Sequence, residues 1–429
     1  MRLFLNPDPL NQPATKVLRV LNRWFPALSS RDYRVFWYGQ CISLVGTWMQ
    51  SFAQAWLVLE LTGSASKLGL VVAAQTLPML LFTLPAGVLA DRYHKPRLVL
   101  VAQVILMISA LILGGLVVSR TVCYWHILAL AALSGTASSV DIPARQSMFV
   151  ELVGRENLPN AIALNSTIFN LARLIGPALA GVTIAAIGTG PCFLINALSF
   201  IPVIITLGMI RGGRHPVAKA AKEDPWKSMA EAIRYILAKP AILLPILLTA
   251  AISVFILNFS VLIPVFGRED LLLGARGCGL LMSSLGVGAL IAALLVAALG
   301  TRKEARGGLM LAGALAMSLF FAILGMEHRA GLAGLMLFAV GFGTIVFNTS
   351  ANAIIQLGAD DHIRGRVVGV YIFAFGGLSP FGSTVTGWMA GHWGAACTLT
   401  ICGAIGMVST LAVWILWNRM PLIVSNQNS

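Results

Sequence analysis

Long uncharged, apolar stretches recur along the chain, and short segments that carry most of the charged residues separate them. A transmembrane helix needs about 20 apolar residues, and most of these stretches hold one helix. Two are too long for one crossing, and glycine and proline break them at 188–191 (GTGP) and 391–394 (GHWG). The pattern predicts twelve spans, near 35–59, 67–90, 98–119, 123–147, 160–187, 191–210, 240–266, 275–299, 307–326, 331–356, 367–390 and 394–418.

The composition excludes a water-soluble protein. Apolar residues make up 58% of the chain and charged residues only 11%, whereas a soluble domain carries about 25% charged residues. The six cysteines form no C-x-x-C pair, so the sequence indicates neither a redox centre nor a metal site. The N-terminus lacks the apolar core of a cleavable signal peptide, and we expect the first span to act as the insertion signal.

The positive charges predict the orientation. If twelve spans cross the membrane, both termini lie on one side, and 24 of the 30 Lys and Arg residues fall on that side. By the positive-inside rule both termini are then cytoplasmic. The net charge of +14 therefore reports topology and attraction to anionic lipid rather than a nucleic-acid partner.

A long polar loop divides the spans six and six. A weak repeat supports duplication, with GTASSVDIPARQ at 135–146 and GTIVFNTSANAIIQ at 343–356. Duplicated six-helix halves with a substrate site between them are typical of transporters. The predicted fold is an all-α integral membrane protein of two pseudo-symmetric six-helix bundles. We expect a cytoplasmic amphipathic segment at 1–34, a bundle at 35–210, a central loop with an interfacial helix at 211–239, a second bundle at 240–418 and a cytoplasmic tail at 419–429.

The loop after the second span reads GVLADRYHKPR. It resembles the signature of the major facilitator superfamily between helices two and three, at Gly87, Leu89, Asp91, Arg92 and Arg97. Glycine allows close helix approach, and an aspartate at a helix end can contact a positive helix N-terminus or an arginine. We therefore interpret Gly87, Asp91, Arg92 and Arg97 as a conformational latch, against the alternative of ordinary positive-inside residues. The equivalent second-half loop, 298–308, lacks the aspartate.

Three further stretches, 30–62, 141–153 and 160–181, resemble the subgroup of enterobactin-exporter-like and macrolide-efflux proteins, which are drug:proton antiporters. The resemblance implies the major facilitator fold, an export direction and a bacterial inner membrane.

Charged residues inside spans are the candidates for proton coupling. Asp141 and Arg145 lie four residues apart on one helix face, together with Ser134 and Ser138. A carboxyl group that burial and a neighbouring arginine influence in opposite directions can exchange a proton, although a static salt bridge is equally compatible with the pattern. Arg173 lies deep in the fifth span, and either contacts an anion, pairs with Asp141 or bridges helices structurally.

Uncharged polar residues at helical spacing predict a substrate cavity, although hydrogen bonding between helices is the alternative. These patches suit an amphipathic or hydrogen-bonding substrate better than an inorganic ion. The candidates are Ser43, Thr47, Gln50, Gln54, Asn165, Asn170, Asn258, Asn348 and Asn352.

Gly176, Pro177 and Gly181 resemble the fifth-helix motif of antiporters in this superfamily, and Pro380 lies at a similar place in the second half. We interpret these four residues as hinges, with close packing between helices as an equally good alternative.

The leading hypothesis is a secondary active exporter of an amphipathic small molecule of the drug or siderophore class, driven by proton antiport with alternating access. The alternatives are an importer on the same scaffold and a non-transporting membrane sensor. No enzyme motif stands in a suitable context. The expected partners are a small-molecule substrate, protons and membrane lipid, with no cofactor, metal or nucleic acid, and the chain is expected to act as a monomer.

Overall fold

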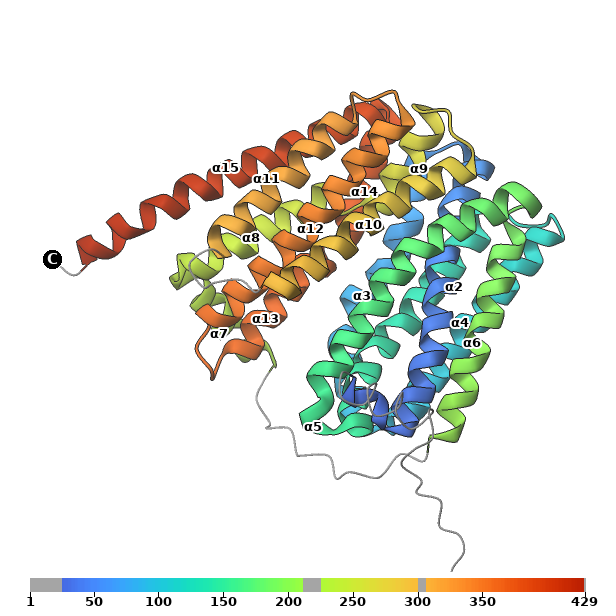
Figure 1. Cartoon of the computed structure of the whole chain (residues 1–429), viewed down its shortest axis with the longest axis horizontal. Helices are drawn as coiled ribbons and strands as arrows, with labels where there is room; N and C mark the ends of the chain where they lie inside the picture. Colours follow the sequence, from blue (N-terminus) through green and yellow to red (C-terminus); the bar gives the residue numbers. More distant parts are fainter. Residues whose placement is uncertain (1–24, 211–224, 300–305, 428–429) are drawn as a thin grey trace, which may run out of the picture.

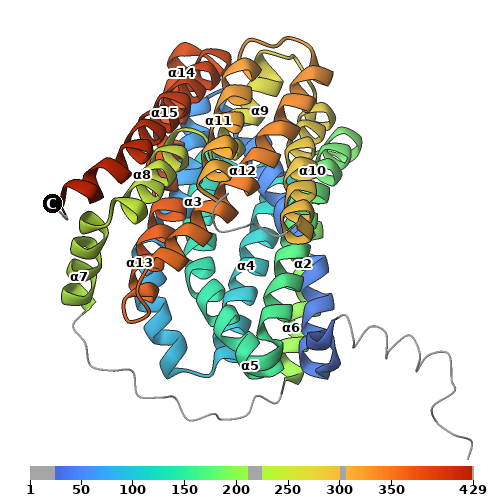
Figure 2. The ribbon, with the colours of Figure 1, turned by 60° about the vertical axis from the view of Figure 1, so that its left-hand side comes forward.

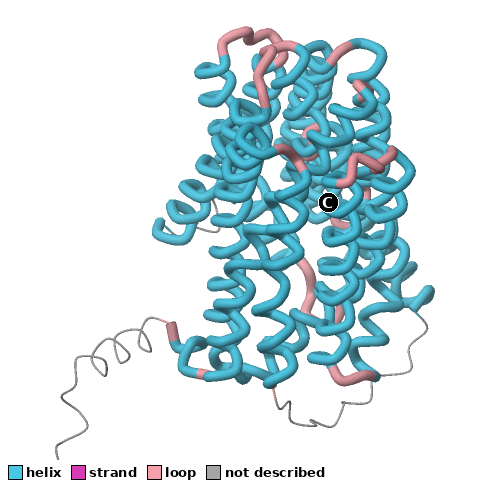
Figure 3. Tube along the Cα trace, turned by 90° about the vertical axis from the view of Figure 1, so that its right-hand side faces the viewer, coloured by secondary structure: helices cyan, strands magenta, loops and turns pink. Residues whose placement is uncertain are grey.

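The chain folds entirely into helices and the turns that connect them. The computed structural model describes residues 25–210, 225–299 and 306–427, apart from the side chains of 83–92, 225–228, 299 and 420–427. These residues include no strand (Figure 3). Ten helical stretches within them are long and apolar enough to cross a membrane. The predicted all-α membrane class is confirmed, and the count of twelve spans stays a prediction.

The first half begins with a short 3-10 turn, Pro26–Ser29, and contains one helix far too long for a single crossing. At 64 residues that helix would extend about 96 Å if straight, against a hydrocarbon core of about 30 Å. It breaks at Gly154, whose φ of 74° favours glycine, so the loop expected between spans four and five is mostly helical. The helices are α2 (Arg31–Thr62), α3 (Ala65–Arg92), α4 (Lys95–Val118), α5 (Tyr124–Ile187) and α6 (Gly190–Met209).

The second half contains two interrupted spans. The predicted span 240–266 is broken at residues 256–258, and the predicted span 367–390 contains a π-helical turn at Phe373–Gly377, directly before Pro380. The final helix runs to Gln427, so the expected tail is helical almost to its end. The helices are α7 (Pro225–Ala238), α8 (Pro240–Phe255), α9 (Phe259–Glu269), α10 (Ala275–Leu299), α11 (Arg306–Leu324), α12 (Ala330–Gly358), α13 (Arg364–Ile372), α14 (Ser379–Trp393) and α15 (Ala395–Gln427).

The two halves form separate bundles that touch mainly at one end. In Figure 1, α2 to α6 lie on the right, α8 and α10 to α15 lie towards the left, α9 lies at the top where the halves meet, and the bundles diverge towards the lower edge. At the contact end α5 packs on α10 and α3 packs on α14. A Cβ added at Gly286 would lie 2.7 Å from the Cα of Leu174, and one at Gly387 would lie 2.8 Å from the Cα of Gly69. Glycine at these positions therefore permits the backbones of the two halves to touch.

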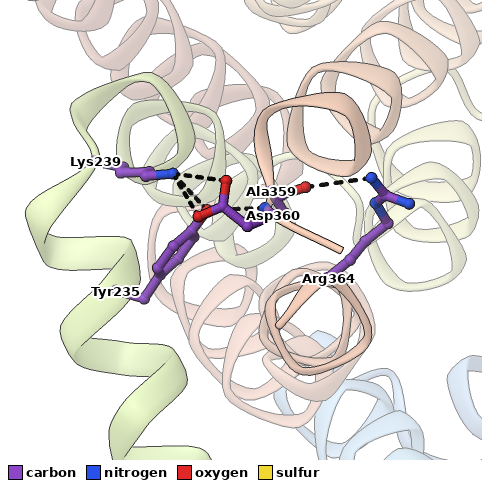
Figure 4. Close-up of polar contacts among 5 residues, drawn as sticks. All are labelled: Tyr235, Lys239, Ala359, Asp360 and Arg364. Carbon is purple, nitrogen blue, oxygen red and sulfur yellow. Dashed lines mark hydrogen bonds and ion pairs between the residues drawn. The ribbon is translucent and has the colours of Figure 1, made fainter. Parts of the chain in front are cut away.

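The helix of the central loop belongs to the second half. Figure 2 shows α7 beside α8 and α13, and Figure 4 shows the polar contacts that hold it. The Tyr235 hydroxyl accepts hydrogen bonds from Lys239 Nζ at 2.6 Å and from the Asp360 backbone N–H at 2.9 Å. Lys239 also pairs with the Asp360 carboxylate at 3.1 Å, and Arg366 pairs with Glu231 of α7. This helix is thus docked on the loop between α12 and α13.

These contacts also shift the pKa values of two side chains outside the spans. The hydrogen bonds that Lys239 donates to Tyr235 and Asp360 raise its pKa, and the hydrogen bond from Lys239 lowers the pKa of Asp360. Residues 1–24 of the expected amphipathic N-terminal segment and residues 211–224 of the expected central loop lie outside the described residues.

Candidate functional site

A cavity of about 390 Å³ lies in the first half. Its walls come from α2, α3, α4, α5 and α6 alone, and aromatic rings alternate there with amide and hydroxyl side chains. This volume falls within the range of sites for drug-sized ligands. The lining residues are Gln40, Ser43, Leu44, Thr47, Trp48, Gln50, Ser51, Gln54, Gln75, Gln103, Leu106, Ser134, Ser138, Asp141, Ile142, Arg145, Gln146, Phe149, Asn165, Phe169, Asn196 and Phe200.

One wall of the cavity carries a buried ion pair. Asp141 is 2% exposed, forms a salt bridge with Arg145 one helical turn later, and accepts a hydrogen bond of 3.0 Å from Gln103 Nε2 of α4. Arg145 is 15% exposed and therefore faces the cavity more openly than its partner does. The predicted pairing of Asp141 with Arg145 is present. Pairing of Asp141 with Arg173, one of the alternatives, is not.

Several polar atoms at this wall lack a protein partner. Among the described residues, Gln40 Nε2, Gln103 Oε1 and Arg145 Nε are buried and make no hydrogen bond. Buried polar groups normally have partners, so these atoms leave hydrogen-bonding capacity at the wall that no described protein group satisfies. They comprise two donors and one acceptor, which can orient an uncharged polar group of a bound molecule.

The amide side chains deeper in the cavity pair across helices. Asn196 of α6 donates to Gln50 Oε1 of α2 at 2.6 Å, and Gln54 donates to Gln75 Oε1 of α3 at 3.4 Å. These pairs satisfy part of the amide groups within the bundle and leave the others at the cavity wall. The two interpretations of the first-span polar stripe, cavity lining and hydrogen bonding between helices, therefore both apply to the same residues.

Five of the predicted cavity residues lie together, and four lie elsewhere. Ser43, Thr47, Gln50, Gln54 and Asn165 line the cavity. The other four are held locally: Asn170 donates to Ser166 O, Asn258 donates to Val254 O at the break between α8 and α9, Asn352 accepts from Gln356, and Asn348 lies near Tyr371, whose hydroxyl donates to its carbonyl. None of these four residues lines the first-half cavity, Asn348 Oδ1 is buried without a hydrogen-bond partner, and a role of the four in binding substrate stays a prediction.

The sequence interpretation missed the amides that complete the cavity. Gln75 and Gln103 stand alone in apolar spans, without the helical spacing that revealed the first-span stripe. Their signal was polarity alone, since an amide inside a membrane helix needs a protein or aqueous neighbour. The other missed lining amides are Gln40, Gln146 and Asn196.

Arg173 lies at the contact between the two halves, outside the set of cavity-lining residues. Its guanidinium carbon is 5.9 Å from the Trp48 ring of α2 and 5.8 Å from the Phe259 ring of α9. Trp48 itself lines the cavity and contacts the Phe169 ring edge-to-face at 5.4 Å. Arg173 is therefore separated from the cavity by one indole ring.

The residues interpreted as hinges pack tightly in this structure. The backbone of α5 is helical through Gly176 and Pro177, and its break lies at Gly154. A Cβ at Gly176 would lie 2.5 Å from Trp48 Cβ, and one at Gly181 would lie 2.6 Å from the Ala275 carbonyl oxygen. The close contacts of both glycines support the packing alternative, and a hinge at Gly176–Pro177 stays a prediction. Pro380 is buried in the first turn of α14, directly after the π-helical turn.

The residues interpreted as a latch fall largely outside the described side chains. Gly87, Asp91 and Arg92 lie in the last turns of α3, whose side chains are not described. Arg97 is exposed in the first turn of α4. Nearby, Lys95 forms a salt bridge with Glu151 and so joins the start of α4 to α5.

Comparison with known proteins places this geometry in a family. Residues 23–428 match the model of a family described as transmembrane secretion effectors. The chain is 25% identical to a staphyloferrin A transporter of Staphylococcus aureus, over 92% of this chain and 98% of that protein. It is 27% identical to the multidrug efflux pump Tap of Mycolicibacterium fortuitum, over 80% of this chain and 85% of the pump. An enterobactin exporter of Salmonella choleraesuis is 30% identical over 61% of this chain and 62% of the exporter.

Solved transporters share the fold. The nucleoside transporter NupG superposes with a TM-score of 0.70 at 12% identity, covering 90% of this chain and 99% of that structure. A transporter of the POT family, in complex with 5-aminolevulinic acid, gives 0.71 at 12% identity, with coverage of 92% and 97%. Likeness at this identity shows the fold alone. The family match and the fold together identify the chain as a membrane transporter rather than an enzyme, and it belongs to the transmembrane secretion effectors of the major facilitator superfamily.

Proposed function

We propose that this protein exports an amphipathic small molecule of the drug or siderophore class by proton antiport. The observation that carries the proposal is the first-half cavity, where the buried Asp141–Arg145 pair meets unpartnered polar atoms and aromatic rings. Proteins similar to this chain are named as a siderophore transporter, a siderophore exporter and a multidrug efflux pump. A mixed aromatic and amide surface suits such molecules better than a small inorganic ion.

In this proposal Asp141 carries the proton. A carboxyl group buried beside an arginine is poised between two influences, since burial favours its neutral form and the guanidinium favours the ion. Opening of the cavity to the outer side, as the substrate leaves, draws Arg145 away and favours protonation of Asp141, whereas a bound substrate favours the ionised carboxylate, as antiport requires. Closure of the cavity then restores the ion pair and releases the proton.

Alternating access supplies the transport step. The described halves contact each other through α5–α10 and α3–α14 at one end and diverge at the other (Figure 1). Rocking of the bundles about the cavity would separate the α5–α10 and α3–α14 contacts and close the opposite end. We place both termini and the diverging end in the cytoplasm by the positive-inside rule, and we propose that one chain suffices for transport.

The test uses a bacterium that lacks its own efflux pumps and expresses this chain. We expect it to tolerate and expel some members of a panel that contains ethidium, staphyloferrin A and enterobactin. Inside-out vesicles should then accumulate the same compound when a pH gradient is imposed and lose it when nigericin removes the gradient. Accumulation that ignores the gradient would remove the antiport, and accumulation of no compound in the panel would count against the export of this class.

A further inference from the structure

The guanidinium of Arg173 joins the two halves through aromatic rings. It lies against Trp48 of the first half and Phe259 of the second, at 5.9 and 5.8 Å from the ring centroids. Phe259 is the first residue of α9, after the break that Asn258 holds through its bond to Val254 O. The cation therefore occupies a fixed place between the bundles, within one ring of the cavity.

Its charge has no counter-ion in the described part of the chain. No acidic side chain there forms a salt bridge with Arg173, and no carbonyl or hydroxyl accepts a hydrogen bond from it. Asp141, the buried carboxylate of this half, is already bound by Arg145 and Gln103. The five N–H donors of Arg173 thus remain available.

The aromatic contacts offset this charge only in part. A charged side chain at membrane depth costs at least about 2.5–3.5 kcal/mol on insertion scales, while a cation–π contact contributes about 0.5–2 kcal/mol. Arg173 as a residue is of intermediate exposure, so it is not sealed off from its surroundings. An oxyanion would supply the missing charge and the acceptors, as guanidinium binds planar carboxylates in a bidentate manner.

The surroundings specify the rest of such a ligand. Trp48 separates Arg173 from the cavity, where Phe169 and Phe200 offer apolar contacts. Ser51 borders both the cavity and the small pocket formed by Pro177, Ser260 and Pro264 at the interface between the halves. A molecule with an apolar body in the cavity would need a short arm that passes the Trp48 ring to reach the guanidinium.

We propose that Arg173 binds the carboxylate of an amphipathic, anionic substrate whose body occupies the first-half cavity. This inference deepens the proposed function, since it names the charge of the exported molecule. An anionic lipid could offer the same chemistry, so the test is made in nanodiscs of neutral phosphatidylcholine. It measures equilibrium binding without any gradient, and failure of proton antiport would leave its result unchanged.

The experiment compares three carboxylates with their uncharged amides: dansylglycine, 1-naphthylacetate and decanoate. Equilibrium dialysis of the full chain, with empty nanodiscs subtracted, gives the dissociation constants. We expect at least one carboxylate to bind about tenfold or more tightly than its amide, because a charge-assisted hydrogen bond is lost in the amide. Arg173→Gln should abolish that preference, Arg173→Lys should keep part of it, and Arg329→Gln, which removes an exposed arginine, should change nothing.

Four results would overturn the proposal. The first is that no carboxylate binds more tightly than its amide to the wild-type chain. The second is that Arg173→Gln weakens a carboxylate and its amide equally while the purified variant stays monodisperse, which indicates a structural bridge. The third is that Arg173→Gln retains the preference. Added phosphatidylglycerol that abolishes dansylglycine binding would assign the site to lipid instead, and would also contradict the proposal.

Discussion

Variants of Asp141 and Arg145 can distinguish a static salt bridge from a proton carrier. Asp141→Asn leaves Arg145 without its counter-ion at the cavity wall. Removal of one partner of a buried pair costs about 3–5 kcal/mol. Arg145 is 15% exposed to the cavity, so water can offset part of this, and we expect a loss of about 2–4 kcal/mol in the free energy of unfolding. SDS-induced unfolding in mixed micelles measures this loss.

The double variant Asp141→Asn with Arg145→Gln is the decisive one. It removes both charges and keeps amide groups that can hydrogen-bond to Gln103. We expect most of the lost free energy of unfolding to return, because no uncompensated charge remains. Accumulation driven by a pH gradient in inside-out vesicles should nevertheless stay at background, since the titrating group is gone. Exchange of labelled for unlabelled substrate without a gradient should continue.

The matched control is Glu151→Gln, which breaks the Lys95–Glu151 bridge in the same bundle but outside the cavity. Both side chains are 21–24% exposed, so this change should cost at most about 1 kcal/mol and leave gradient-driven accumulation intact. If the double variant recovers both its stability and its gradient-driven accumulation, Asp141 only holds the helices together and the proposed proton pathway is wrong.

Three further outcomes are expected. Gly279→Leu should push α5 away from α10, because a Cβ at this glycine would contact the backbone of the facing helix. A cysteine introduced at the cavity residue Thr47 should then react faster with maleimide from the outer side. Gly208→Leu, which meets open space, should not have this effect, and equal reactivity of the two variants would contradict a closing contact between α5 and α10. Asn258→Ala should lower the free energy of unfolding by about 1–2 kcal/mol without changing substrate affinity, and a loss of affinity at unchanged stability would return Asn258 to the substrate site. Because the pKa of Asp360 is lowered and that of its partner lysine is raised, the contact of α7 should stabilise fully above the ordinary Asp pKa, weaken as pH falls through the lowered value, and weaken again only above the ordinary Lys pKa. The rate of hydrogen exchange in α7, corrected for the intrinsic rate, should therefore be constant from pH 5 to 9. Asp360→Asn should increase this rate and Asp361→Asn should not. A marked change of the rate within this pH range would refute the Lys239–Asp360 contact as the one that docks α7.

Hydropathy predicted the helices well because lipid imposes one strong requirement, an apolar stretch of sufficient length. The errors fall where a helix is interrupted inside such a stretch. The break at residues 256–258 contains no glycine or proline, and Asn258 stabilises it through a side-chain bond to Val254 O. Its polarity indicated a cavity residue, and its amide makes a local bond that the sequence did not reveal. Sequence pattern alone does not distinguish these two uses of an asparagine.

The cavity was predicted mainly from the face of one helix. Helical spacing located the face that contains Ser43, Thr47, Gln50 and Gln54, since residues three and four apart share a face. It gave no information on which other helix that face meets. Gln103 was therefore missed, although its amide completes the environment of the carboxylate beside it. Packing between helices, rather than local pattern, brings these groups together.

The cavity belongs to one half, and this raises the question of how its occupant can move the other. A ligand shifts a conformational equilibrium only by its different affinity for the two states. Groups that touch the first half alone keep the same contacts when the bundles rock as rigid units. Arg173 differs, because its ring contacts join Trp48 of one half to Phe259 of the other. An anion bound to this guanidinium would compete with its contacts to the two rings. If the proposals above hold, recognition of the substrate's charge would thereby loosen the closed contact between the halves.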